Sequence, residues 1–454
     1  MAKYQKYVEY KDSGCEWTDK LPIHWNSVHL KWISTIYAGG TPSKTIESYW
    51  ENGTIPWINS GAVNQTYILE PSTYITQTAY ENSSAKWIPQ KALVMALAGQ
   101  GKTKGMVAQL GINTTCNQSM GAIIPNDLGY ARYLFWWITS NYQNIRNMAG
   151  GDLRDGLNLE HLGDMDCPLP NDEEIKKIAN FLDHETAKIN LLIAKQEKLI
   201  ELLKEKRQAV ISHAVTKGLN PNVPMKDSGV EWLGEVPEHW IVKRLKHISP
   251  KIGVGLVINP STYTREEGVY FIFGGDVKEY EFDLSKTRRI SKHDSDNLLP
   301  SRLNHRDLVS IRVGYPGVTA VVTKELEGAN CASIIVIRRG KYNSDWLCAA
   351  MNIWVGRQQV ELASYGAAQK QFNVADAIEF KFPVPPANEQ DEIAIFVEET
   401  RKKFDNLSNK ALQQIELLKE RRTALISAAV TGKIDVRNWQ HPNQKNNTPT
   451  ELSA

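Results

Sequence analysis

The sequence predicts an α+β (mixed α/β) protein in which two similar globular domains are separated by two long α-helices. Three observations predict it. The chain repeats itself at one fixed offset, two long segments without proline or glycine carry apolar residues at heptad spacing, and both globular parts contain strand-like runs broken by turn residues. A chain of 454 residues is also longer than one ordinary core requires, which agrees with a division into domains.

The repeat has an offset of 215 residues. The matched blocks are Lys11-Asp12-Ser13-Gly14 with Lys226-Asp227-Ser228-Gly229, Pro22-x-His24-Trp25 with Pro237-x-His239-Trp240, and Glu201 to Glu205 with Glu416 to Glu420. Between them, residues 34–165 and 248–380 have nearly equal lengths and little identity. The chain is therefore a tandem duplication whose globular parts share a fold and present different surfaces. The alternative is a drifted duplication in which only the scaffold stayed alike.

The first helical segment covers residues 172–217. Apolar residues recur there every seven positions in two adjacent seams, Ile175, Leu182, Ile189, Leu203 and Val210, and Ile178, Leu192 and Leu199. Asn171 with Glu174 is typical of a capping box, and Gly218 ends the segment. Residues 388–431 follow the same register. A single amphipathic helix of roughly 65 Å needs a partner along its seam, so we expect the two segments to form an antiparallel coiled coil with pseudo-twofold symmetry. The alternative is a core helix pair without a spacing role.

In the globular parts, β-branched and aromatic runs predict strands at 55–58, 93–98, 269–273, 308–313 and 333–338. Shorter helices are predicted at 128–146 and 345–362. Loops between these elements carry side chains that suit DNA, because Arg and Lys bond guanine or phosphate and Asn and Gln bond adenine. The candidate DNA-binding residues are Lys44, Asn59, Ser60, Gln100, Lys102, Lys104, Gln118, Arg288, Arg289, Arg312 and Arg338. For any one of them alone, simple surface solvation is the competing interpretation.

Bulk composition narrows the class of protein. The net charge of +2 is small for a protein that binds many DNA phosphates alone, so we expect local basic patches or partners that share those contacts. Five scattered cysteines without CxxC spacing argue against a disulfide framework or structural zinc. The N-terminus lacks an apolar signal region, and no apolar run is long enough to cross a bilayer. We therefore expect a soluble, cytoplasmic protein.

Signatures of catalysis do not occur in the sequence. Gly101-Lys102-Thr103 resembles the end of a phosphate-binding loop, but the required earlier glycine is Ala96. No methylation motif, dinucleotide fingerprint or pair of histidines at helical spacing is present. His24 and His239 lie beside repeated tryptophans, which favours a structural corner. The sequence predicts no catalytic residues and no metal ligands.

The chain resembles the specificity (S) subunits of Type I restriction–modification enzymes. The resemblance covers almost the whole chain up to about Val436. It is carried by the opening Lys11-Asp12-Ser13-Gly14-x-Glu16-Trp17, by Pro22-x-His24-Trp25, by Gly39-Gly40-Thr41-Pro42-Ser43 leading to Ile55-Pro56-Trp57, and by the Pro168-x-Pro170 and Glu389-Gln390 helix entries. The second globular part departs from the pattern, because Lys251-Ile252-Gly253-Val254-Gly255 stands near the place of the Gly-Gly-Thr-Pro-Ser block.

This resemblance implies a non-catalytic subunit that reads an asymmetric, bipartite site on double-stranded DNA. Target recognition domains would span 1–170 and 221–386, the long helices 171–220 and 387–436 would set the spacing and dock partners, and 437–454 would form a polar, disordered tail. Two modification (methyltransferase) and two restriction subunits would be the partners. S-adenosylmethionine, ATP and Mg would bind to those partners, and this chain would bind no cofactor.

Three rival functions remain at this point. The chain could serve a Type II-like enzyme in which nuclease and methyltransferase are fused. It could be a coiled-coil adaptor with two binding heads and no DNA, or a free-standing nuclease.

Overall fold

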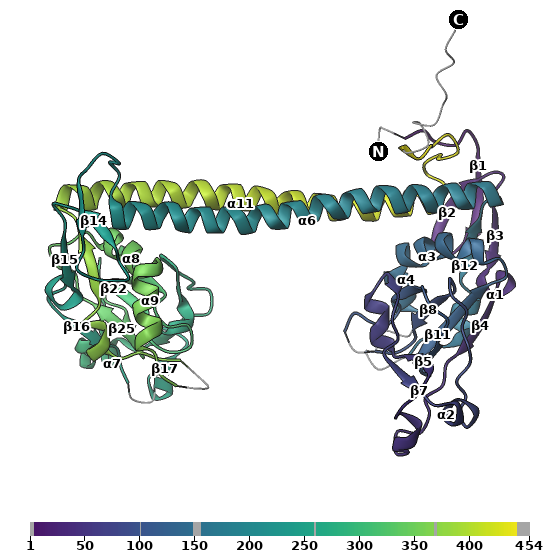
Figure 1. The fold of residues 1–454 in the computed structure, drawn as a ribbon, viewed down its shortest axis with the longest axis horizontal. Coiled ribbons are helices and arrows are strands. Elements are labelled where there is room, and N and C mark those ends of the chain that lie inside the picture. Colours follow the sequence, from purple (N-terminus) through teal and green to yellow (C-terminus); the bar gives the residue numbers. More distant parts are fainter. Residues whose placement is uncertain (1–3, 100, 149–155, 258–259, 367–369, 443–454) are drawn as a thin grey trace, which may run out of the picture. The chain divides into compact units, whose positions relative to one another are not determined.

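The computed structural model describes residues 4–99, 101–148, 156–257, 260–366 and 370–442. The chain divides into two compact units. The first unit comprises residues 1–195 and 414–454, and the second unit comprises residues 196–413. Each unit contains one globular part and sections of both long helices, α6 (Asp172–Lys217) and α11 (Ala387–Val430) (Figure 1).

The first unit is built around a five-stranded sheet in the order β4-β11-β8-β9-β6 and a three-stranded sheet in the order β10-β5-β7. Its strands are β1 (Tyr10–Cys15), β2 (Thr18–Pro22), β3 (Asn26–His29), β4 (Ser34–Ala38), β5 (Ile55–Ile58), β6 (Tyr67–Ile68), β7 (Thr73–Ile75), β8 (Leu93–Ala96), β9 (Val107–Leu110), β10 (Thr115–Cys116), β11 (Met120–Pro125) and β12 (Asp166–Leu169). Its shorter helices are α1 (Leu30–Ile33), α2 (Gln77–Glu81), α3 (Ala131–Ser140), α4 (Tyr142–Asn147) and α5 (Leu159–Gly163).

The second unit contains two four-stranded sheets, in the orders β16-β25-β22-β23 and β17-β21-β18-β24. Its strands are β13 (Met225–Asp227), β14 (Glu235–Pro237), β15 (Ile241–Arg244), β16 (Ile252–Val254), β17 (Thr264–Arg265), β18 (Val269–Ile272), β19 (Val277–Lys278), β20 (Glu281–Phe282), β21 (Arg288–Ile290), β22 (Leu308–Ile311), β23 (Thr319–Val321), β24 (Asn330–Cys331), β25 (Ile334–Ile337) and β26 (Lys381–Val384). Its shorter helices are α7 (Lys292–Asn297), α8 (Ser344–Asn352), α9 (Trp354–Ala363) and α10 (Val374–Ala377).

The sheets of the two units correspond at the offset found in the sequence. The order β4-β11-β8-β9 matches β16-β25-β22-β23, and the order β10-β5-β7 matches β24-β18-β21. In these three-strand groups the middle strands, β5 and β18, each have one parallel and one antiparallel neighbour. The duplication therefore preserved the strand framework, including regions in which almost no residue identity survives.

Both long helices form as the heptads predict, and each unit pairs the start of one helix with the end of the other. In the first unit Ile175, Leu182 and Ile189 share a core with Leu425 and Val430. In the second unit, Ile211 and Val215 of α6 share a core with Ile393 and Val397 of α11. Start-to-end pairing within each unit makes the helix pair antiparallel.

The predicted seams are only partly buried. Leu192 and Leu199 are more than two-fifths exposed, and so is Leu202. A pair of helices covers only one stripe of each member, so leucines beyond the globular parts stay in contact with solvent.

Two predicted helices are interrupted. The segment predicted at 128–146 begins with a 3₁₀ turn and breaks at Asn141 between α3 and α4. The side chain of Asn141 donates to the Trp137 carbonyl at 3.0 Å and so competes with the helical ladder. The segment predicted at 345–362 breaks at Ile353, whose extended backbone (ψ 177°) separates α8 from α9.

All five cysteines are buried. Burial raises the pKa of the thiols of Cys116 and Cys331 to about 12, so almost no thiolate exists near neutrality. We expect a thiol reagent at pH 8 to label none of the five in the folded protein within minutes and all five in denaturant. Rapid labelling of any one under native conditions would contradict this packing.

No helix in the described part of the chain is both long enough and apolar enough to cross a membrane.

Candidate nucleic-acid interface

A repeated histidine–glutamate contact anchors each globular part to the first turn of a long helix. In the first unit, His24 Nε2 lies 3.0 Å from both carboxylate oxygens of Glu174, which is only 2% exposed, and the hydroxyl of Tyr7 donates to the same carboxylate at 3.1 Å. In the second unit, His239 Nε2 lies 2.6 Å from Glu389. The two pairs stand 215 residues apart, and both histidines serve the framework.

Glu174 differs in part from the sequence prediction. Asn171 caps α6 as predicted, because its side chain accepts from the Glu174 amide at 3.0 Å. The Glu174 carboxylate, however, contacts Tyr7 and His24. Burial and this carboxylate raise the pKa of the Tyr7 hydroxyl well above its ordinary value.

A second contact is also duplicated between the two units. Lys31 Nζ is 2.5 Å from Asp164, and Lys246 Nζ is 2.5 Å from Glu379, again with a shift of 215 in both residues. Each lysine donates a hydrogen bond that lowers the pKa of its carboxyl partner. The framework contacts are thus the same in the two units, and the differences concentrate elsewhere.

The first difference is the Gly39-Gly40 loop of the first unit. A Cβ on Gly39 would overlap the backbone of Cys116, and one on Gly40 would overlap the backbone at Ser84 and Ala85. In the second unit, Gly255 meets the equivalent Cys331 in the same way. The next residue there is Leu256, whose amide donates to the Cys331 carbonyl at 2.9 Å. Only the first unit therefore keeps the double glycine at this point.

Beside this loop the first unit has a hollow of about 760 Å³, which we call the Trp50 pocket. It is lined by Thr41, Lys44, Glu47, Trp50, Glu51, Trp57, Asn59, Asn117, Gln118 and Ser119. Three of the predicted DNA-binding residues, Lys44, Asn59 and Gln118, meet here although they come from three separate segments. Ser60 follows Asn59 in the chain and lies outside this lining.

The predicted Lys102 lies in a different groove. That groove is lined by Lys102, Tyr142 and Arg422 among others, and the Lys102 carbonyl accepts from the Tyr142 hydroxyl. Lys104 is only 5% exposed, and its carbonyl accepts from Arg146 at 3.1 Å. Gln100 lies outside the described residues. The structure thus separates Lys102 and Lys104 from the Trp50 pocket.

In the second unit the predicted cations lie on the sheet and its loops. Arg288 and Arg289 are on β21, with Arg288 stacked 4.7 Å from the Phe273 ring and Arg289 3.6 Å from the Tyr270 ring. Arg312 directly follows β22 and is half-buried. At the positions equivalent to Arg288 and Arg289, the first unit has Thr73 and Tyr74 on β7.

Arg338 is already engaged within the fold. Its guanidinium lies 2.6 Å from the carboxylate of Asp307, which is 1% exposed, and donates to the carbonyls of Arg302 and Pro300. These contacts fix the side chain against its own domain. We therefore leave Arg338 out of the interface proposed below.

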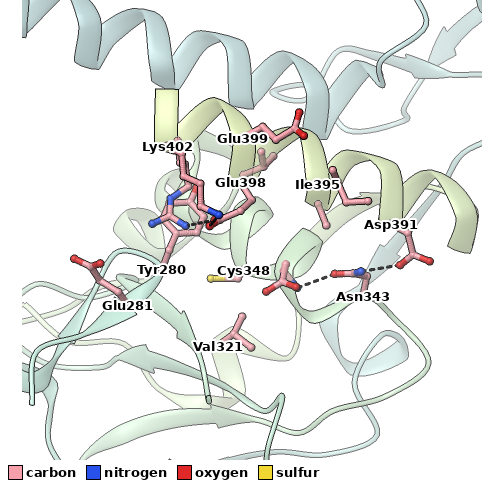
Figure 2. A pocket seen from close by; sticks show the side chains of 14 residues that line it. Tyr280, Glu281, Val321, Asn343, Cys348, Asp391, Ile395, Glu398, Glu399 and Lys402 are labelled. Carbon is pink, nitrogen blue, oxygen red and sulfur yellow. Dashed lines mark hydrogen bonds and ion pairs between the residues drawn. The ribbon is translucent and has the colours of Figure 1, made fainter. Parts of the chain in front are cut away.

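The second unit also has a hollow of about 840 Å³ under the first turns of α11, shown in Figure 2. Carboxylates dominate its lining: Glu281, Asp345, Asp391, Glu398 and Glu399, against Arg401 and Lys402. Such a surface repels phosphate, so we place no DNA contact there. In the described residues, no group of three or more His, Cys, Asp and Glu side chains could hold a metal ion.

Sequence reasoning missed several residues that define these surfaces. The family block includes Trp57 but gives it no role of its own, although its ring meets the Trp50 ring edge to face at 5.2 Å in the pocket wall. Asp307 was missed altogether, because nothing local in the sequence marks it as the partner of an arginine 31 positions away. The double glycine was the signal that could have located the pocket.

Comparisons with known proteins agree with this architecture. Residues 22–202 match the model of the Type I restriction modification DNA specificity domain. The chain is 30% identical over 183 residues to the Type I restriction enzyme EcoR124I/EcoR124II specificity subunit of Escherichia coli, a match that covers 39% of this chain and 44% of that subunit. It is 22% identical over 440 residues to the StySPI specificity subunit of Salmonella potsdam, covering 93% and 92% of the two chains.

Among solved structures, a chain from a study of complex assembly and conformational transition of the type I R-M system superposes with a TM-score of 0.71. It is 16% identical, and the superposition covers 91% of this chain and 99% of that one. At this identity the likeness concerns the fold. The predicted architecture of globular α+β domains with two long helices is confirmed.

Proposed function

We propose, from the premise that this chain belongs to the family of Type I restriction–modification specificity subunits, that it selects the DNA sequence on which its partner enzymes act. Each globular part reads one half of a bipartite site on double-stranded DNA. Because the two parts differ, the site is asymmetric, unlike the palindrome that a homodimeric reader selects.

One observation carries this proposal. The two units share their framework contacts and differ at the surfaces that hold the candidate DNA-binding residues. His24–Glu174 and Lys31–Asp164 recur as His239–Glu389 and Lys246–Glu379. By contrast, the first unit has the Trp50 pocket, whose lining includes three amides, two indoles, Glu47, Glu51 and Lys44. The second unit carries Arg288 and Arg289 on β21, where the equivalent strand β7 of the first unit has Thr73 and Tyr74. Amides favour adenine and arginines favour guanine or phosphate, so the units suit different sequences.

The proposed domain roles follow the sequence boundaries. Residues 1–170 and 221–386 are target recognition domains, and 171–220 and 387–436 form the helical spacer. The exposed leucines of α6 and α11 offer a docking surface for two modification subunits, and two restriction subunits complete the assembly. We assign methyl transfer and DNA cleavage, with S-adenosylmethionine, ATP and Mg, to those partners and no catalytic step to this chain. Since its substrate is cellular DNA, we expect the complex in the cytoplasm.

Methylation mapping tests the proposal. DNA is sequenced by a single-molecule method from cells that express the companion methyltransferase with and without this chain. We expect a gapped, asymmetric motif that is modified only when the chain is present. If no motif depends on the chain while the methyltransferase is expressed and soluble, the proposed function is wrong, and an adaptor without a DNA target explains the architecture better.

Lys44 provides a narrower prediction. Its exposed side chain lies at the edge of the Trp50 pocket, where it suits a phosphate. We expect Lys44→Ala to weaken DNA binding by the assembled complex and to lower the slope of log K against log salt by about 1, without changing the motif. Lys20→Ala removes an exposed lysine outside this pocket and is the matched control. An unchanged salt slope would remove Lys44 from the interface.

A further inference from the structure

The Trp50 pocket is a hollow with aromatic walls, whereas contact with base edges in a DNA groove does not require a hollow. Two indole rings form one side of it, and their N–H groups are both satisfied by backbone: Trp50 Nε1 donates to the Ser43 carbonyl at 3.0 Å, and Trp57 Nε1 donates to the Gly40 carbonyl at 3.0 Å. These bonds fix the orientation of both rings. Trp57 is buried and Trp50 is half-buried, so Trp50 offers the accessible aromatic surface.

The lining of the pocket also carries hydrogen-bonding groups. The carbonyl oxygen of the Gln118 side chain accepts from the Thr41 hydroxyl, which holds that amide in place. The side-chain oxygen of Asn117 is enclosed and out of reach of a ligand. The exposed amides of Asn59 and Gln118 are therefore the groups that the pocket offers for hydrogen bonding.

The dimensions and chemistry of the pocket narrow the ligand. A hollow of about 760 Å³ lies in the range of small-molecule sites. A flat aromatic face and amide groups in one hollow suit a planar ring with hydrogen-bonding edges, as in a nucleobase. Lys44, in the same lining, suits the phosphate of that nucleotide.

We propose that the Trp50 pocket binds one nucleobase turned out of the DNA duplex in the half-site read by the first unit. This inference rests on the proposed function and adds to it a mode of reading. The base stacks on Trp50, and the exposed amides of Asn59 and Gln118 form hydrogen bonds with its edge. Stacking and hydrogen bonding in the pocket offset the loss of pairing and stacking in the duplex. In the second unit Phe271 stands at the position equivalent to Trp57, because it pairs with Asn330 and Arg288 as Trp57 pairs with Thr115 and Thr73. Its ring has no N–H group with which to fix its orientation.

Two readouts on the assembled complex and its mapped site test the inference without any mutation. First, 2-aminopurine is placed singly at each position of both half-sites, and we expect fluorescence to change strongly at one position besides the methylated base. Second, each base is kept while its partner on the opposite strand is mismatched. A base that leaves the duplex costs less to extrude from a mismatch, so we expect binding to tighten several-fold at that one position, as at the methylated base, and to weaken at the others.

Variants then link the signal to the pocket. Gln118→Ala should abolish the tightening at the mismatched position, and Trp50→Phe should retain part of it, because phenylalanine keeps a stacking surface. Gln77→Ala, an exposed amide on α2 outside the pocket, should change neither readout. If mismatches weaken binding at every position except the methylated base, the inference is wrong while sequence-specific binding, and with it the proposed function, stands. If the assembled complex shows no sequence-specific binding, both fail.

Discussion

Gly40→Val is expected to abolish modification of the gapped site. The Gly40 amide donates to the Cys116 carbonyl at 2.8 Å, and its own carbonyl accepts from Trp57 at 3.0 Å. A side chain here would overlap the backbone at Ser84 and Ala85, which cannot move aside as a flexible side chain could. Overpacking of this kind costs about 1–3 kcal/mol or more. The loop must shift, and the pocket that it borders loses its shape.

The readouts for this variant are the methylated fraction at the mapped motif and the thermal unfolding of the purified complex. Gly253→Ala is the control, because a Cβ there meets nothing within 4 Å. If the Gly40→Val complex still modifies the site normally, the double-glycine loop is not needed for DNA recognition. Loss of modification with an unchanged melting curve would place the defect in the pocket itself, and a lowered melting temperature would place it in the stability of the first unit.

The fixed offset of 215 residues explains how much of the fold could be predicted. Both copies keep the same framework, so repeated residues such as His24 and His239 predict equivalent structural positions. For the same reason, the strand order of one unit recurs in the other. The heptads located α6 and α11 within a few residues because a long helix is a local pattern with a repeated signal.

The site was harder to predict, for a physical reason. The Trp50 pocket brings together Lys44, Asn59 and Gln118 from segments that are 15 to 74 positions apart along the chain, and no local pattern encodes their meeting. Residue type alone also does not give the surroundings of individual side chains. Lys104 is buried, and Arg338 bonds its own domain, although both residue types are usually exposed.

Asp307→Ala is expected to destabilise the second unit strongly. The Asp307 carboxylate accepts from Arg338 at 2.6 Å, from the Arg339 amide at 2.9 Å and from the Asn304 amide at 2.9 Å. Removing it leaves a largely buried guanidinium without its counter-charge, and breaking a buried pair in this way costs about 3–5 kcal/mol. The measurement is the denaturant midpoint of unfolding. Asp296→Ala removes an exposed carboxylate that pairs with Arg302, and it should shift the midpoint far less.

A double variant decides between the structural role of Arg338 and a role in DNA reading. Asp307→Leu with Arg338→Met replaces the pair by apolar side chains of similar bulk, which removes the uncompensated charge. We expect the double variant to recover much of the stability that Asp307→Ala loses and to modify the same motif. If stability returns but the second half of the motif is lost or relaxed, Arg338 contacts DNA, and its ion pair with Asp307 serves to aim it. Because the pair lies 2.6 Å apart and the guanidinium also donates to two carbonyls, the first outcome is the expected one.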